Sequence, residues 1–295
     1  MRQTCVAPAK VNLILHVGAL DVAAAKHPVS TLMVFADIGD EVSIEGADHP
    51  EFALEGPMAE ALGDTDLADN LVLRARDILL NRIRRPTPPF RLTLNKVLPV
   101  ASGLGGGSTD AGAAFRLIRD ALGLPIRDDE LEALAAGIGA DGPACLMARP
   151  VVGEGWGDRL SPAPTLPCLD AVLVNPGKPC STGAVYRAFD ALTGAPDPSA
   201  PLIPALLESA EETAAWLSYA RNDLEAPAER ICPDITEVLG LLRAEPETLL
   251  ARLSGSGATC FALCSGDYEA ETLAERISSL RPDWWVRRCR LGGPW

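Results

Sequence analysis

The chain has 295 residues, about twice the length of a typical domain, which predicts two compact halves. Hydrophobic residues make up 47% and charged residues 22%, an ordinary globular composition that argues against extensive disorder. The formal net charge of −14 repels a polyphosphate backbone, so we expect no nucleic-acid partner. No stretch reaches the ~20 apolar residues of a membrane span, so we expect a cytoplasmic protein without membrane contact.

The cysteines and lysines of the chain are both sparse. Eight cysteines are scattered without a CxxC pair, which predicts reduced, mostly buried thiols rather than a metal site or a disulfide scaffold. Among 26 basic residues the only lysines are Lys10, Lys26, Lys96 and Lys178. A lysine ammonium is a movable point charge whose pKa responds to burial, unlike a guanidinium. Lys10 and Lys96 therefore stand out as candidates for a functional site, whereas compositional drift explains Lys26 and Lys178 equally well.

The first predicted strand, Val11–Val17, begins directly after Lys10. Because the neighbours of Lys10 are apolar, its ammonium needs water or a partner. Asn12 lies two residues further on and shares its face of the strand, so the pair is predicted to line a cleft. From this segment alone, a surface lysine is an equal alternative. Further apolar runs at Leu32–Ala36 and Val42–Ile44 predict more strands of a mixed sheet.

A helix is predicted over Leu71–Ile83, where apolar residues recur at helical spacing after Asp69 and Asn70. Asn70 is either the cap of this helix or a ligand-binding residue. A strand follows at Phe90–Asn95, where apolar and polar residues alternate, and it leads into Lys96.

The sequence Gly103-Leu104-Gly105-Gly106-Gly107-Ser108 lies between that strand and a helix predicted from Ser108 to a stop at Gly123. Glycines permit positive φ, so consecutive N–H groups can converge on phosphate oxygens at the N-terminus of a helix. The segment is neither a P-loop, because no lysine follows the last glycine, nor a GxGxxG fingerprint. We predict that it binds the phosphates of a nucleotide, with Ser108 as a contact for Mg²⁺.

Asp141 interrupts a small, apolar segment that has the composition of a buried one. A buried carboxylate needs a compensating partner, and Lys10 is a candidate. A carboxylate beside an ammonium is suited to polarise a hydroxyl for phosphoryl transfer. Taken alone, Asp141 is better explained as a turn or cap residue before Pro143.

Two features mark the C-terminal half. The proline-rich passage Ser161–Pro167 predicts a connection between two domains. We predict that these domains are residues 1–160 and 161–295. A second small-residue loop, Ser254–Ala258, lies between a helix-like stretch, Glu247–Leu253, and an apolar run, Thr259–Leu263. By itself this loop indicates no more than a turn entering a strand.

Three segments together resemble the GHMP kinase superfamily, which is named for galacto-, homoserine, mevalonate and phosphomevalonate kinases. In chain order they read PAKVNL, LPVASGLGGGSTDA and LSGSGATCFAL. Within the superfamily the resemblance is greatest to the kinases that act on 4-diphosphocytidyl-2-C-methyl-D-erythritol in the non-mevalonate isoprenoid pathway. The further matching segments are Phe35–Asp40, Asp69–Leu71, Gly139–Asp141 and Asn222–Leu224.

The resemblance implies a mixed α/β (α+β) fold of two domains. The first is a ribosomal-protein-S5-like domain that binds ATP and Mg²⁺, and the second a ferredoxin-like α/β plait that binds substrate. It implies an ATP-dependent kinase that phosphorylates the 2-hydroxyl of the cytidine diphosphate-linked methylerythritol. By position, the implied site residues are the catalytic Lys10 and Asp141, the ATP-binding Asn70, Lys96 and Gly103–Ser108, and the substrate-binding Asn12, His27 and Tyr186.

One departure from the family pattern concerns the residue before His27. The family has a tyrosine there, whereas this chain has Lys26. A lysine stem can cover a cytosine ring, or its ammonium can reach a phosphate, but neither supplies an aromatic face. The family's GADVPFF-like run also reads GADGPACL here, so Gly142 and Ala144 predict altered packing around Asp141.

Two rival functions remain at the level of sequence. A sister kinase for homoserine, mevalonate or a sugar would share the ATP loop and differ at His27 and Tyr186. A non-catalytic binding protein on the same fold would not need Lys10 and Asp141. We expect either a monomer or a homodimer.

Overall fold

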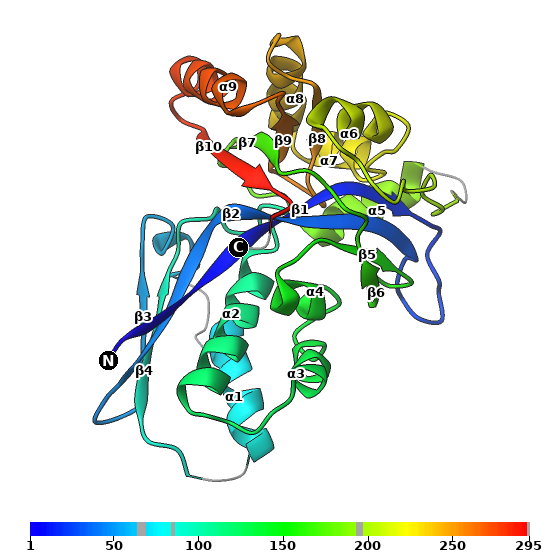
Figure 1. Cartoon of the computed structure of the whole chain (residues 1–295). Coiled ribbons are helices and arrows are strands. Elements are labelled where there is room, and N and C mark those ends of the chain that lie inside the picture. The colour runs from blue at the N-terminus through cyan, green and yellow to red at the C-terminus, as the bar shows by residue number, and fades with distance from the viewer. Residues whose placement is uncertain (64–68, 84–85, 193–196, 294–295) are drawn as a thin grey trace. The chain divides into compact units, whose positions relative to one another are not determined.

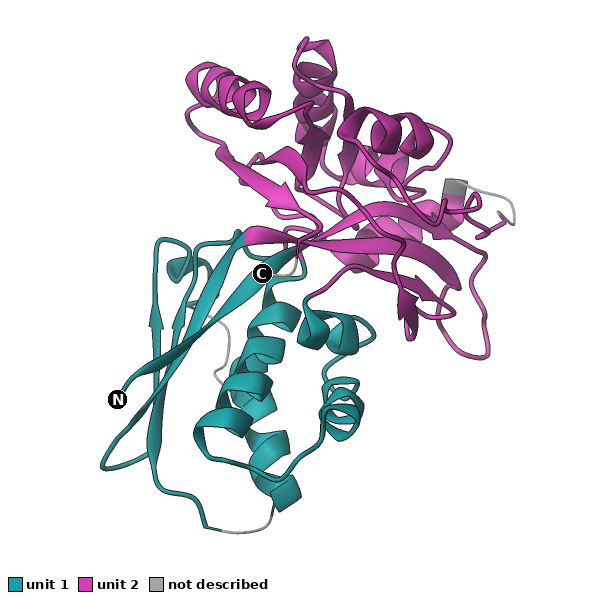
Figure 2. Cartoon of the chain, viewed as in Figure 1, with its two compact units in different colours: residues 1–9, 38–100, 105–148 teal, residues 10–37, 101–104, 149–295 magenta. Residues whose placement is uncertain are grey.

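The computed structural model describes residues 1–63, 69–83, 86–192 and 197–293 (Figure 1). The chain forms two compact units (Figure 2): unit 1 holds residues 1–9, 38–100 and 105–148, and unit 2 holds residues 10–37, 101–104 and 149–295. Strands β1 (Gln3–Val17) and β2 (Val29–Gly46) contribute residues to both, so the units are not consecutive halves of the chain. The division into family domains at residues 160 and 161 stays a prediction.

Unit 1 contains a mixed sheet, as its apolar runs predict. The second half of β2 pairs antiparallel with β4 (Phe90–Asn95), and β3 (Glu51–Glu55) pairs parallel with the other edge of β4. The predicted strands at 32–36 and 42–44 are parts of the single long strand β2. Alternate residues of these strands, among them Val42 and Leu92, are fully buried.

Helices cover one face of the unit 1 sheet (Figure 1). They are α1 (Leu71–Ile83), α2 (Gly106–Ala121), α3 (Asp128–Ala135) and α4 (Gly142–Met147). A short 3₁₀ turn at Glu60–Leu62 buries no residue. Helix α1 has the predicted bounds. Helix α2 begins two residues before the predicted Ser108, within the glycine loop, and ends before Gly123, whose φ of 55° fits the predicted stop.

Unit 2 is built around an antiparallel sheet in the order β10-β7-β9-β8, and β10 also pairs with β2 through Leu291 and Ala36. Strands β5 and β6 extend the first half of β2. The bounds are β5 Val151–Glu154, β6 Arg159–Pro162, β7 Leu169–Asn175, β8 Leu250–Leu253, β9 Cys260–Leu263 and β10 Trp285–Leu291.

The helices that share a core with this sheet are α5 (Thr182–Leu192), α7 (Glu225–Ile231), α8 (Asp234–Ala244) and α9 (Asp267–Leu280). Unit 2 also contains α6 (Ala210–Leu217). The helix-like stretch Glu247–Leu253 was predicted wrongly, because its second half is strand β8. Its leucines and alanine favour a helix, but pairing of Leu250–Leu253 with β9 overrides that preference.

The cysteines and the helix lengths agree with the composition. All eight cysteines are free thiols and six of them are buried, which confirms the prediction. Among the helices of the described residues, none combines the length and the apolar character that a bilayer crossing requires.

Candidate functional site

In the glycine loop, residues with positive φ alternate with residues that lack it. Ala101, Gly103 and Gly105 have φ values of 50°, 79° and 64°, while the residues between them do not have positive φ. Such alternation is typical of backbone nests, in which successive N–H groups turn toward one side and bind anions. The loop therefore has the backbone shape that its glycines predict.

The carbonyl groups of residues 102–104 accept hydrogen bonds from other parts of unit 2. Ser102 O accepts from Thr259 N–H at 2.9 Å, and Gly103 O accepts from the Ser254 hydroxyl at 3.0 Å. Leu104 O accepts from Lys10 N–H at 2.8 Å. Three consecutive carbonyl oxygens therefore each accept a hydrogen bond, which offsets part of the negative charge that would repel a phosphate.

The second glycine loop, residues 254–257, holds the first one in place. A Cβ at Gly103 would lie 2.3 Å from Ser254 O, so the two backbones touch and only glycine fits. The second loop is itself held, because Asn222 Nδ2 donates to the carbonyl oxygens of Leu253 and Gly255 at 2.9 and 2.8 Å. Sequence alone indicated a simple turn, and the structure adds this supporting contact.

Helix α2 begins inside the glycine loop. Gly105 is its N-cap and supplies no side-chain hydrogen bond, so the first N–H groups of the helix are left without a side-chain cap. Gly106, Gly107 and Ser108 form the first turn, where the helix dipole adds partial positive charge. This turn is suited to bind phosphate, and Ser108 is half-buried within it.

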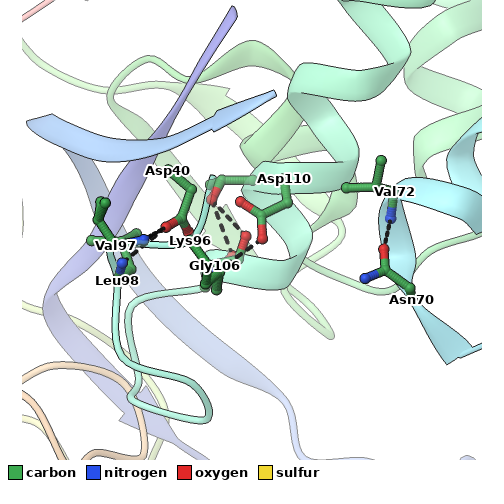
Figure 3. Close-up of polar contacts among 10 residues, drawn as sticks. Asp40, Asn70, Val72, Lys96, Val97, Leu98, Gly106 and Asp110 are labelled. Carbon is green, nitrogen blue, oxygen red and sulfur yellow. Dashed lines mark hydrogen bonds and ion pairs between the residues drawn. The ribbon is translucent and has the colours of Figure 1, made fainter. Parts of the chain in front are cut away.

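Lys96 lies beneath this turn, buried between two carboxylates (Figure 3). Its ammonium Nζ is 2.5 Å from Asp40 Oδ2 and 2.9 Å from Asp110 Oδ2. A Cβ at Gly106 would lie 2.9 Å from the same Nζ, so the ammonium packs directly against the first turn of α2. Lys96 was predicted to bind ATP, and its observed partners are these two aspartates.

Asp40 and Asp110 were missed as site residues, although the sequence carries a signal for each. Asp40 is in phase with the buried Val42 and Ile44 of β2, so strand alternation points it inward. Asp110 follows Gly106 by one helical turn and precedes the buried Ala111. A charged residue at a core position of either pattern signals a buried ion pair.

Burial and charge shift the pKa values within this cluster. Burial lowers the pKa of the Lys96 ammonium, but Asp110 and Asp40 outweigh that effect and leave the pKa above its ordinary value. Burial raises the pKa of the Asp110 carboxyl to about 8, against the opposing effect of Lys96. Both shifts favour the protonated forms, as expected where two carboxylates share one cation.

Asn70 caps helix α1. Its Oδ1 accepts from Val72 N–H at 3.0 Å, and its carbonyl accepts from Arg74 N–H at 3.0 Å. The cap interpretation is therefore confirmed. Its predicted ATP contact is untested and stays a prediction.

Lys10 and Asn12 are buried at the start of the unit 2 part of β1, with exposed fractions of 6% and 3%. Asn12 donates through Nδ2 to Thr31 Oγ1 at 2.8 Å, and its backbone N–H donates to Ser254 Oγ at 3.3 Å. Its Oδ1 is buried without a hydrogen-bond partner among the residues that the structure describes. A buried acceptor of this kind is suited to bind a ligand donor.

Asp141 is half-buried at the N-terminal end of α4, and its carbonyl accepts from Cys145 N–H. A Cβ at Gly142 would lie 2.0 Å from Ala135 O, so α4 begins in close contact with the end of α3. The glycine after Asp141 is therefore required by packing, which accounts for this departure from the family pattern.

His27 and Tyr186 lie together in unit 2. Their ring centroids are 4.9 Å apart at 31°, and the ring centroids of Phe189 and His27 are 5.7 Å apart at 82°. His27 Nδ1 is 3.0 Å from Gly18 O, which fixes this nitrogen as the donor. The side chain of Lys26 is exposed, in a turn bridged to Asp21. Phe189 is an aromatic neighbour that sequence reasoning missed.

No group of three or more metal-ligating side chains occurs among the described residues. Mg²⁺ is commonly held by one or two protein oxygens together with substrate phosphates, so it does not need such a group. The half-buried hydroxyl of Ser108, in the first turn of α2, has the chemistry of one such oxygen ligand.

Comparisons with known proteins give one consistent result. Residues 70–149 match the model of the GHMP kinases N terminal domain, and residues 202–282 match that of the GHMP kinases C terminal domain. The chain is 60% identical over 292 residues to a protein of Caulobacter vibrioides named 4-diphosphocytidyl-2-C-methyl-D-erythritol kinase, covering 99% of this chain and 100% of that one. A protein of the same name from another Caulobacter species is 61% identical over 297 residues, which covers both chains completely.

Solved structures show the same relation. A crystal structure of 4-(cytidine 5'-diphospho)-2C-methyl-D-erythritol kinase superposes with a TM-score of 0.79 at 31% identity, covering 99% of this chain and 100% of that one. A mevalonate kinase from Methanococcus jannaschii superposes with a TM-score of 0.71 at 12% identity, covering 99% of each chain, and supports the fold alone.

Proposed function

We infer the activity from family membership: this chain belongs to the GHMP kinases, and within them to the 4-diphosphocytidyl-2-C-methyl-D-erythritol kinases. It is an ATP-dependent kinase with a mixed α/β fold. It phosphorylates the 2-hydroxyl of 4-diphosphocytidyl-2-C-methyl-D-erythritol in the non-mevalonate isoprenoid pathway. Identity of 60% over the full length makes a sister kinase for homoserine, mevalonate or a sugar a poorer explanation.

The glycine loop is proposed to bind the ATP phosphates. Positive φ at alternate residues from Ala101 to Gly105 is the observation that carries this proposal. The uncapped first turn of α2, at Gly106–Ser108, continues the row of N–H donors with the partial charge of a helix N-terminus. Backbone donors of this kind recognise phosphate in any nucleotide. They would therefore position ATP, but they do not determine which alcohol receives the phosphoryl group.

We propose Lys10 and Asp141 as the catalytic pair. In a direct in-line transfer the acceptor oxygen forms a bond to the γ-phosphorus while the bond to the β-bridging oxygen breaks and ADP leaves. Asp141 accepts the proton of the acceptor hydroxyl, and Lys10 neutralises the developing negative charge. Burial of Lys10 supports this role, because an ammonium held away from water interacts more strongly with a charged group.

Bound Mg²⁺ would neutralise charge on the phosphate oxygens during transfer. We propose Ser108 as the protein oxygen that holds it, since Ser108 lies in the same turn as the phosphate-binding N–H groups. The remaining ligands would be phosphate oxygens and water.

The acceptor is proposed to contact Asn12, His27 and Tyr186. The Oδ1 of Asn12, which has no partner in the part of the chain that the structure describes, is suited to accept a hydrogen bond from a substrate hydroxyl. The His27–Tyr186 ring pair offers the aromatic surface on which a cytosine can pack. The cytosolic location and the choice between monomer and homodimer remain predictions.

Turnover with alternative acceptors tests the activity. Purified protein with MgATP is expected to release ADP rapidly with 4-diphosphocytidyl-2-C-methyl-D-erythritol and only at background rate with homoserine or mevalonate. Equal rates with all three alcohols would reject the assigned acceptor. ADP release without any acceptor preference would also remove His27 and Tyr186 from substrate recognition.

Asp141→Asn tests the catalytic assignment. It is expected to leave ATP affinity largely intact and to lower kcat by about 10²–10⁴-fold, the usual value of a positioned proton-transfer group. Asp48→Asn, which removes an exposed carboxylate outside every helix and strand of the fold, is the matched control. Unchanged kcat in Asp141→Asn would exclude this residue from the mechanism.

A further inference from the structure

Thr31 is a buried residue of strand β2 whose hydroxyl bonds to strand β1 twice. The residue is 3% exposed, and its Oγ1 donates to the backbone carbonyl of Ile14 at 2.7 Å. The same Oγ1 accepts from Nδ2 of Asn12 at 2.8 Å. All three residues belong to unit 2. Both bonds are hidden from water, and neither takes part in the proposed phosphoryl transfer.

The chemistry of this hydroxyl decides which way the Asn12 carboxamide points. A hydroxyl has one proton, and the Ile14 carbonyl can only accept, so the Thr31 proton goes to that carbonyl. The Thr31 oxygen can then only accept from Asn12, and only the amide Nδ2 can donate. The reversed carboxamide would place two acceptor oxygens in contact without a proton between them. Thr31 therefore turns Nδ2 toward itself and Oδ1 away.

The Oδ1 of Asn12 is left as a buried acceptor beside the two glycine loops. It has no hydrogen-bond partner in the part of the chain that the structure describes. A Cβ at Gly255 would lie 3.3 Å from this Oδ1 and 3.1 Å from Gly103 O, so the atom lies where the two loops meet. A carboxamide with a purely structural role would be bonded at both ends, because a buried polar atom without a partner is costly. This end of the carboxamide therefore points to a ligand that brings a donor.

Other bonds hold the backbone of β1 without involving the carboxamide. Asn12 N–H donates to Ser254 Oγ at 3.3 Å. The buried Arg252 donates through Nη1 to the carbonyl of Leu13 at 2.9 Å. The strand is thus held at residues 12 and 13 by partners other than Thr31. Removal of the Thr31 hydroxyl is therefore expected to release the carboxamide and to leave the strand in place.

We propose that Thr31 is a positioning residue of the substrate site: its hydroxyl holds the Asn12 carboxamide with Oδ1 toward the alcohol substrate, so that Asn12 recognises a hydroxyl of the erythritol chain as a hydrogen-bond donor. The inference rests on the proposed contact between Asn12 and this substrate. It adds the residue that decides which end of the Asn12 carboxamide the substrate meets.

The place of Asn12 selects the erythritol end of the alcohol substrate. Ser254 Oγ, which accepts from Asn12 N–H, donates in turn to Gly103 O of the proposed phosphate loop at 3.0 Å. The alcohol has to reach that loop to receive the phosphoryl group, whereas the cytosine is proposed to pack on the histidine–tyrosine ring pair. In the proposed transfer the proton of the reacting hydroxyl goes to Asp141. Oδ1 is therefore assigned to a neighbouring hydroxyl of the erythritol chain, which keeps its proton.

Steady-state kinetics of Thr31→Val test the inference. Valine keeps the shape of threonine without the hydroxyl, so the Asn12 carboxamide can turn its Nδ2 toward the substrate. With the full chain and MgATP, we expect the KM for the alcohol substrate to rise about tenfold, through one lost and misdirected hydrogen bond. The KM for ATP should stay the same, and kcat should change less than the KM for the alcohol, because Lys10 and Asp141 are intact. An unchanged KM for the alcohol substrate would overturn the inference.

CDP separates recognition of the erythritol chain from a general disturbance of the site. It carries the cytidine and the diphosphate but no erythritol, and it is measured as a competitive inhibitor against the alcohol substrate. Its inhibition constant is expected to be the same in Thr31→Val and in the wild type. An equal loss of affinity for CDP and for the alcohol substrate would reject the inference, because the substitution would then act on the whole site.

Two further threonine variants test the hydroxyl itself. Thr31→Ser retains the hydroxyl and is expected to restore most of the affinity for the alcohol substrate, so a KM as high as that of Thr31→Val would contradict the inference. Thr213→Val is the matched control, because the Thr213 hydroxyl is also buried and donates to a backbone carbonyl, that of Ser209, at 2.7 Å. This control is expected to retain the wild-type KM. An equal rise in the control would reject a specific role of Thr31.

Asn12→Ala distinguishes failure of the inference from failure of the substrate contact on which it rests. If Asn12→Ala and Thr31→Val both leave the KM for the alcohol substrate unchanged, the proposed contact with Asn12 fails as well. If only Asn12→Ala raises this KM, the contact stands and the role of Thr31 is rejected. Thr31→Ala also lacks the hydroxyl and takes the place of Thr31→Val if valine prevents folding, with the same expected rise in KM.

Discussion

The two glycine-rich loops of this protein have similar compositions and opposite environments. Residues 254–257 read Ser-Gly-Ser-Gly and are all buried, and their backbone and side-chain groups bond to Thr259, Asn222 and Gly103. Residues 103–108 read Gly-Leu-Gly-Gly-Gly-Ser and, apart from the buried Leu104, are half-buried or exposed, with no side-chain cap on the helix that begins within them. A glycine loop binds a ligand only where the surrounding hydrogen bonds leave its N–H groups available.

Gly103→Ala would break the contact between the two loops and has the largest expected effect. The new Cβ would lie 2.3 Å from Ser254 O, and alanine would have to adopt a φ of 79°. We expect a loss of about 2–5 kcal/mol in the free energy of unfolding. Denaturant unfolding measures this loss, and the KM for ATP is expected to rise on the order of tenfold or more because the loop shifts.

Gly240→Ala is the matched control for that substitution. Gly240 lies within α8, and no atom lies within 4 Å of its added Cβ. Here alanine is expected to raise the free energy of unfolding by about 0.5–1 kcal/mol through helix propensity. A similar loss in both variants would show that the close contact at Gly103 is not the cause.

Ser254→Ala removes the hydroxyl that joins the two loops. The carbonyl of Gly103 then loses its partner, and we expect a cost of about 1–3 kcal/mol in the free energy of unfolding. The KM for ATP should rise more than the KM for the acceptor.

Ser256→Ala sharpens the comparison within the same loop, because the Ser256 hydroxyl bonds to Thr182 at 2.8 Å instead of to the first loop. Its effect on the KM for ATP is expected to be smaller than that of Ser254→Ala. Equal effects would mean that the second loop acts as a whole and not through Ser254.

Asp110→Asn tests a difference in charge between the two loops, since the cluster of Asp40, Lys96 and Asp110 lies against Gly106 of the first loop. The pKa of Asp110 is raised to about 8 from an unfolded value of about 3.9. The stability that its carboxyl contributes is therefore fully present below pH 4 and is lost as the pH rises through 8. The variant should exceed the wild type by about 1–2 kcal/mol in the free energy of unfolding at pH 8 and by less at pH 5, as unfolding at both pH values will show.

Ala101→Gly has the smallest expected effect. Ala101 is exposed and has a φ of 50°, a conformation that costs a non-glycine residue about 1–2 kcal/mol. Glycine relieves this strain but adds about 0.4–1 kcal/mol of unfolded-state entropy, so the net gain is expected to be about 0–1 kcal/mol. Thermal unfolding measures it, with Ala215→Gly in helix α6 as a control that should lose about 1 kcal/mol.

Local patterns were sufficient for several elements. Helix α1 over Leu71–Ile83 and strand β4 over Phe90–Asn95 have their predicted bounds, because apolar spacing there is regular and uninterrupted. Strand β8 was predicted as a helix, because four residues show too little periodicity and its pairing partner is remote in sequence. The aromatic pair of His27 and Tyr186 likewise joins segments that are more than 150 residues apart.

The sequence by itself determined the family, and it suggested the proposed phosphate loop and the candidate catalytic residues, since these are carried by contiguous motifs whose chemistry depends on residue type. Tertiary structure decided the partners of Lys96, the contact between the two glycine loops and the hydrogen bonds that orient the Asn12 carboxamide. Hydrogen bonds and desolvation depend on which distant backbone groups surround a side chain. Only the folded chain brings those groups together.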